Sequence, residues 1–155
     1  MIQKYTMNEF RVFAHGQSFN PDEYLKTAPI EFDGVWHKGE EGRDHPKSSG
    51  VYKVLGDGQK LTILQQQEIA TKFLKDNRDA LRALAQHPEI TTFVLGLQYH
   101  IELDESIIGF CMSPSNLLMN HALDIGIRIT FYVTLDRKQE WERDWESEED
   151  AQHQA

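Results

Sequence analysis

The predicted fold depends most on one stretch, Thr91–Leu103, which reads TTFVLGLQYHIEL. The run is apolar and rich in residues that favour β-strands, and its second half alternates between two faces. One face takes Leu97, Tyr99, Ile101 and Leu103, and the other takes Gln98, His100 and Glu102. We therefore expect a long central strand with one apolar face and one polar face.

A second stretch, Ile127–Leu135 or IRITFYVTL, has the same alternation. Its apolar face holds Ile127, Ile129, Phe131, Val133 and Leu135, and its other face holds Arg128, Thr130, Tyr132 and Thr134. If the two strands are neighbours, they form a sheet with one buried and one wet face.

The remaining chain supplies shorter elements. Further strands are expected at residues 10–15, 32–38, 51–55 and 107–112, and helices at residues 21–26, 64–86 and 115–124, the second with a candidate break at Asp76-Asn77. Asn20-Pro21 is typical of a helix start, and Gly126 of a helix end. The predicted fold class is α+β: a mostly antiparallel sheet of about five strands with two main helices packed on one face. Residues 1–138 form one domain, and residues 139–155 form an acidic C-terminal tail that contains tryptophan.

Composition excludes several classes of protein. The 155 residues hold no apolar run long enough for a membrane helix, no secretory signal and a single cysteine, Cys111, which reads as a buried structural residue. These features predict a cytoplasmic protein with no membrane partner.

The net charge of −9 points to the kind of partner. From Asp136 onward, eight acidic and three basic residues give −5, which leaves −4 for the other 135 residues. Nucleic-acid binding is not expected, because phosphate contacts require a basic surface. A basic protein partner fits this charge.

The polar faces of the two long strands make the first candidate site. His100 and Glu102 share a face, and Arg128 and Tyr132 join them if the strands are neighbours; Arg11 or His15 of the first strand could also contribute. Such a group could bind a ligand or a protein, or carry out acid–base chemistry. The alternative is a solvated sheet face with ordinary cross-strand pairs.

Two further groups are candidates for binding. Trp36 and Lys38, with Arg43 nearby, form a basic and aromatic patch that could bind phosphate; alternatively, the tryptophan anchors the core beside a solvated loop. Trp141 and Trp145 lie four residues apart in the tail, where they could pack on the domain or act as a docking segment. The seven histidines include no spacing typical of a metal site, and neither a metal nor a cofactor is predicted.

Four segments resemble the bacterial domain of unknown function 4279 family. They are FRVFAHGQSFNPDEYLKTAP, WHKGE, TFVLGLQYHIE and SPSNLLMNHALDIGIRITFYV, and together they span most of residues 8–135. The resemblance implies an α+β fold and supplies no activity. Small bacterial domains of this style include immunity or accessory proteins encoded beside toxins, which is an analogy of genomic context.

Three functions remain open from the sequence. A non-enzymatic protein-binding domain, as in an immunity-type protein that neutralises a basic toxin, is favoured over an enzyme. The alternatives are a small-molecule or phosphate-binding enzyme that uses the polar sheet face, and a structural domain that dimerises through a sheet edge. The sequence does not set the oligomeric state.

Overall fold

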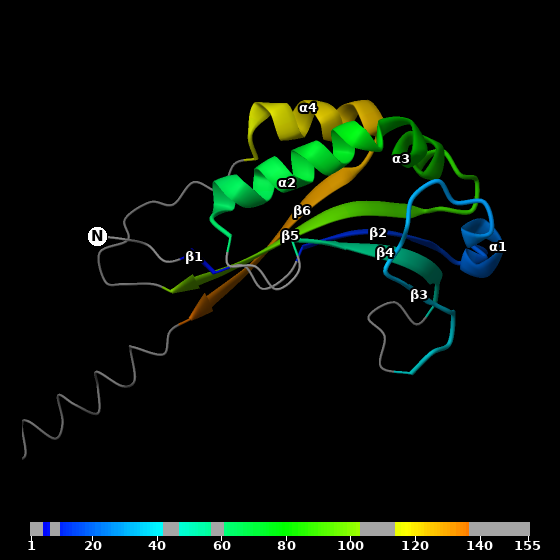
Figure 1. The fold of residues 1–155 in the computed structure, drawn as a ribbon. Helices are drawn as coiled ribbons and strands as arrows, with labels where there is room; N and C mark the ends of the chain where they lie inside the picture. The colour runs from blue at the N-terminus through cyan, green and yellow to red at the C-terminus, as the bar shows by residue number, and fades with distance from the viewer. Residues whose placement is uncertain (1–4, 7–9, 42–46, 57–60, 103–113, 137–155) are drawn as a thin grey trace, which may run out of the picture.

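A computed structural model describes residues 5–6, 10–41, 47–56, 61–102 and 114–136 (Figure 1). The predicted strand at residues 107–112 and the tail from residue 139 lie outside this part of the chain. The described elements are β1 (Tyr5–Thr6), β2 (Phe10–Gly16), α1 (Pro21–Leu25), β3 (Gly34–Trp36), β4 (Ser49–Leu55), α2 (Ile63–Asp76), α3 (Arg78–Ala85), β5 (Thr92–Glu102), α4 (Asn116–Ile125) and β6 (Arg128–Asp136).

All described strands belong to one sheet, in which β5 is central. β5 pairs with β6 on one side and with β2 on the other, and the sheet continues through β4 to β3. The two-residue β1 also pairs with β5, opposite Ile101 and His100, where β6 already occupies the other side. β1 therefore extends the line of β2, and the sheet is five strands wide.

Among the described strands, only one pair is parallel. β2 pairs antiparallel with β4 and with β5, and β3 pairs antiparallel with β4, whereas β5 and β6 run in the same direction. The chain between them crosses over through α4, as a parallel connection requires. The predicted α+β fold with a mostly antiparallel sheet is confirmed.

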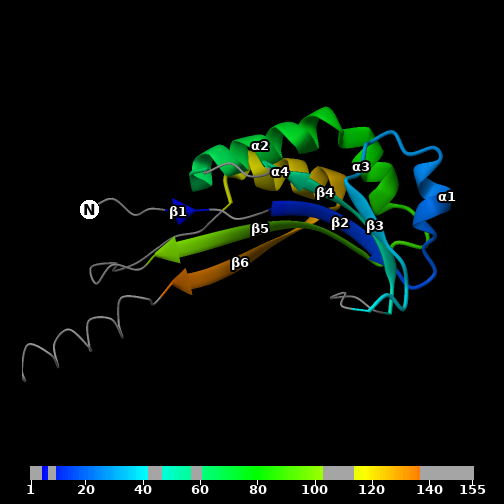
Figure 2. The same cartoon turned by 60° about the horizontal axis from the view of Figure 1, so that its bottom comes forward.

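The longer helices all lie on one face of the sheet. Figure 1 shows α2, α3 and α4 above the strands, and in Figure 2 no described helix covers the opposite face. The core fills the space between the two layers. Its fully buried members come from every layer and include Phe10, Val12, Val51, Leu74, Leu81, Leu95, Leu97 and Leu118.

Local signals set the helix boundaries. The Asn20 side chain accepts a hydrogen bond from the backbone N–H of Glu23 to begin α1, and Ser115 caps α4 in the same way through Leu118. Gly126 ends α4 in the left-handed conformation, with φ of 87°. The start and end predicted from Asn20-Pro21 and Gly126 are confirmed.

The helix expected at residues 64–86 is divided in two. α2 ends at Asp76 and α3 begins at Arg78, so Asn77 separates them. The Asn77 side chain donates to the carbonyl oxygen of Phe73 at 2.9 Å, and an amide bonded back to the preceding turn competes with continuation of the helix. The candidate break at Asp76-Asn77 is confirmed, and it makes α3 a third main helix among the described elements.

Candidate functional site

The helix-free side of the sheet, called the open face below, is the candidate site. In β5 and β6 the register places Val94 beside Arg128, Gly96 beside Thr130 and Gln98 beside Tyr132. In β2, Arg11 lies opposite Gly96 and Phe13 opposite Val94. The described side chains on this face belong to Arg11, Phe13, His15, Trp36, Tyr52, Val54, Thr92, Val94, Gln98, Arg128, Thr130 and Tyr132.

The register separates the residues proposed for acid–base chemistry. His100 and Glu102 are level with Thr134 and Asp136, whereas Arg128 is level with Val94. Six residue steps along β5 therefore separate the level of Arg128 from that of His100, which corresponds to about 20 Å. The positions share the open face, but parallel pairing does not bring them together, and an antiparallel pair would have been needed to place Arg128 next to Glu102.

The middle of the open face is more apolar than the sequence predicts. Val94 is 2% exposed and Phe13 is half-buried, although both belong to the face expected to be wet. Phe13 stacks on His15 with ring centroids 6.2 Å apart, and His15 lies 5.8 Å from the Trp36 ring. A line of rings thus runs across β2, β4 and β3.

Arginine and tyrosine side chains surround this line. The Arg11 guanidinium lies over the Tyr52 ring, 5.2 Å from its centroid, which is a cation–π contact. Tyr132 is 49% exposed and lies beside Gly96, where an added Cβ would come within 3.1 Å of its ring and 3.6 Å of the Phe13 ring. Glycine at this position lets rings from two strands approach the same piece of backbone.

Trp36 of the predicted basic and aromatic patch lies on this same face. Its ring covers Gly50, where any Cβ would overlap with it, and it is 7% exposed. Lys38 is exposed, and its backbone N–H donates to Ser49 Oγ at 2.8 Å. Arg43 lies outside the described residues, so the patch is described only in part.

His37, between these two residues, bridges two carboxylates. Its Nε2 lies 2.7 Å from Asp22 Oδ2 and its Nδ1 lies 3.0 Å from Glu40 Oε1. The Asp22 hydrogen bond is the main cause that raises the pKa of His37, and Glu40 adds to it, so the imidazolium form is favoured. No cluster of three metal-binding side chains occurs among the described residues.

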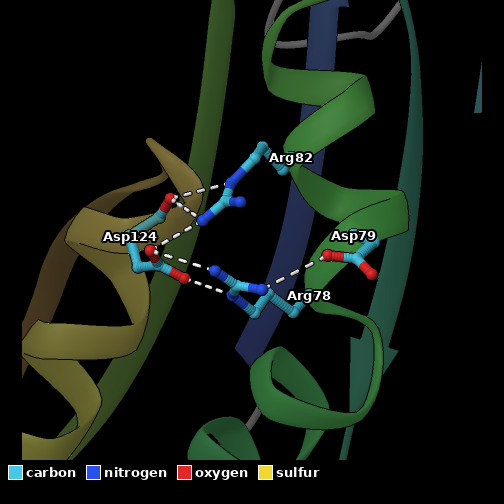
Figure 3. A network of polar contacts seen from close by, with 4 residues as sticks. All are labelled: Arg78, Asp79, Arg82 and Asp124. Carbon is cyan, nitrogen blue, oxygen red and sulfur yellow. Dashed lines mark hydrogen bonds and ion pairs between the residues drawn. The ribbon is translucent and has the colours of Figure 1, made fainter.

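A second polar group joins the helices on the other side of the sheet (Figure 3). Asp124 of α4 accepts from Arg82 Nη2 at 2.6 Å and also from Arg78, and Arg78 pairs with Asp79 at 3.4 Å. The Asp124 carbonyl oxygen accepts from Arg82 Nε at 3.1 Å, which satisfies a free carbonyl at the end of α4. The arginines hold the pKa of Asp124 below its usual value, with the Arg78 hydrogen bond as the largest cause. This network holds α3 against α4 and is structural.

Two hollows lie away from the centre of the open face. One, of about 640 Å³, is formed between α1 and α3 by residues that include Tyr24, Leu84, His87 and Glu89. The other, of about 570 Å³, is an apolar groove between α4 and β6, lined by Met119, Leu123, Ile129 and Phe131 among others.

The aromatic part of the open face was not predicted from the sequence. Phe13 and Tyr52 stand at positions where alternation places polar residues, and that departure was the available signal. Trp141 and Trp145 lie outside the described residues. No described helix is long and apolar enough to cross a membrane.

The chain matches no protein-family model, and no curated protein and no solved structure shows significant similarity to it.

Proposed function

We propose that this chain is a non-enzymatic protein-binding domain and that the open face is its interface. One observation carries the proposal: a sheet face without a described helix presents part-exposed Phe13, Tyr52 and Tyr132 together with exposed Arg11 and Arg128. Tyrosine and arginine are enriched among residues that dominate binding energy at protein interfaces.

A protein surface fits the open face better than a small substrate does. Small ligands are bound in concave sites, and the two hollows described above lie elsewhere. The enzymatic alternative requires His100, Glu102 and Arg128 to act together, whereas the register places Arg128 six residues from the level of His100. Distance therefore disfavours acid–base chemistry by this group.

The proposed partner is a basic protein, and an immunity-type role against a basic toxin is the specific form of the proposal. The net charge of −9 supports it. The register also places Glu102 level with Asp136, at the ends of β5 and β6. A basic partner would be attracted to this end while aromatic and arginine side chains contact it at the centre. The resemblance to the domain of unknown function 4279 family is compatible with this role.

Binding to the purified product of the neighbouring gene tests the proposal. We expect Arg11→Ala and Tyr52→Leu each to raise the Kd about 30-fold, the effect of losing a central interface residue. Leu64→Ala and Lys72→Ala are matched controls, because both side chains are exposed on α2 in the helix layer, and they should leave Kd unchanged. Calorimetry on folded variants measures the four values.

The opposite pattern would refute the interface. If Leu64→Ala or Lys72→Ala weakened binding while Arg11→Ala and Tyr52→Leu did not, the helix layer would be the binding surface. If the neighbouring product did not bind at all and a pull-down from the native host recovered no partner, the protein-binding function itself would be wrong.

A further inference from the structure

β6 lies at one edge of the sheet that the described strands form. Among the described residues it pairs only with β5, and it is nine residues long, whereas β3 at the opposite edge has three. Edge strands are normally blunted by proline, glycine bulges, lysine or short length, because a long regular edge invites another strand to pair. The sequence of β6, RITFYVTLD, contains no proline, glycine or lysine. The edge is therefore suited to pairing with a further strand.

The apolar groove between α4 and β6 runs beside this edge. Leu123, which lines it, is 71% exposed, and Phe131 and Ile129 of β6 are half-buried there. A strand that paired with β6 would lie beside this groove and could cover its apolar side chains. The occupant should supply both a strand and apolar side chains.

The sequence of β6 is chemically symmetric about Tyr132, its central residue. An antiparallel pair of two β6 strands centred there would place Arg128 opposite Asp136, Ile129 opposite Leu135, Thr130 opposite Thr134 and Phe131 opposite Val133, with Tyr132 opposite itself. Opposite charges face each other at both ends of the pair. At the inner positions apolar residues face apolar residues, and threonine faces threonine. A centre at Phe131 instead would place Arg128 opposite Thr134 and lose both charge pairs.

We propose that a second copy of this chain binds here: two β6 strands pair antiparallel about a twofold axis at Tyr132. The contact is isologous, so each copy contributes both members of the charge pair. The dimer has one continuous sheet in which two open faces lie side by side. This inference goes beyond the proposed function and stands whether or not the open face binds a partner protein.

Charge reversal tests the pairing in the full-length chain. We expect a dimer by light scattering coupled to size exclusion, and Arg128→Asp or Asp136→Arg alone should raise the dimer Kd at least about tenfold, because each places like charges opposite one another twice. The double variant Arg128→Asp with Asp136→Arg restores both pairs and should regain the wild-type Kd. Rescue by the double variant is not expected if the residues act only within one copy, since eight positions of β6 separate them.

A cysteine at the twofold axis gives an independent test. In a Cys111→Ser background, which removes the single native cysteine, Tyr132→Cys should form a disulfide-linked dimer under mild oxidation, because directly opposite strand residues have Cα atoms about 4.5–5.5 Å apart. Thr130→Cys is the control: its two copies would be four residues out of register, about 13 Å apart, beyond disulfide reach. A monomer at all concentrations, or a dimer that cross-links equally through both cysteines, would overturn the proposal.

Discussion

Gln66 is a buried amide with unused hydrogen-bonding groups. It lies on α2, is 0% exposed, and neither its Nε2 nor its Oε1 has a hydrogen-bond partner. Burying such a group without partners is unfavourable, because its bonds to water are lost and not replaced. Its neighbour Gln67 is different: the Gln67 Oε1 accepts from the Ser115 backbone N–H at 2.6 Å and so ties α2 to the start of α4.

This contrast gives a prediction with its own control. Gln66→Met keeps a similar shape and removes the unpaired amide, so we expect it to raise the free energy of unfolding by about 1–3 kcal/mol. Gln67→Met should lower it by about 1–2 kcal/mol, because the Ser115 N–H loses its acceptor. Urea denaturation followed by circular dichroism measures both changes. A destabilised Gln66→Met protein would mean that the amide has a role in the native state.

At the scale of elements, Asp124 couples α4 to α3 in a way that depends on pH. Because Arg78 and Arg82 lower the pKa of Asp124 in the folded state, its carboxylate stabilises the fold above the ordinary value of 3.8, and this contribution is lost as pH falls through the folded-state pKa. We expect Asp124→Asn to be less stable than wild type at pH 7 and to approach wild type as pH falls below 3.8. Added salt should also reduce the difference, since the groups are exposed.

Thermal unfolding at a series of pH values and salt concentrations measures this effect. Asp79→Asn is the matched control, because Asp79 is 91% exposed and its ion pair with Arg78 is long, at 3.4 Å. This substitution should change the stability little at any pH. If the Asp124→Asn difference persisted unchanged at low pH, the carboxylate would not be its source.

Alternation along the chain predicted much of the sheet because side-chain direction is a local property. Neighbouring residues alone decide which side chains of β5 and β6 share a face. The same holds for the strand at residues 10–15 and for the caps of α1 and α4. The direction in which β6 runs beside β5 is not local. It depends on a crossover through α4, and it decided that Arg128 lies level with Val94 and far from His100.

The composition of the open face was predictable only in part for the same reason. The sequence analysis placed Arg11 and His15 with Arg128 and Tyr132 on one face, as the register does. The rings of β2, β4 and β3 come together on this face because these strands are neighbours in the sheet. The strand order β5-β2-β4-β3 does not follow the order of the chain, so the sequence did not predict it. His37 shows a similar limit, since its partner Asp22 lies 15 residues away on α1.

At the scale of the whole molecule, the described core and most of the net negative charge lie in different parts of the chain. The buried core residues all lie between Phe10 and Ile127, and the partly buried ones that pack on them end at Phe131. Residues 139–155 carry seven acidic and one basic residue, or −6, so a chain that ends at Lys138 has a net charge of −3. We therefore expect this truncation to leave the unfolding midpoint within about 2 °C of the full chain, because at this size a shift of 2–4 °C corresponds to about 1 kcal/mol. The truncated chain should associate more slowly with a basic partner, and its association rate should depend less on salt, because long-range attraction sets that rate. Calorimetry gives the midpoint, and stopped-flow binding at two salt concentrations gives the rates. A fall of 8 °C or more, about 2 kcal/mol, would instead show that Trp141 and Trp145 pack on the domain.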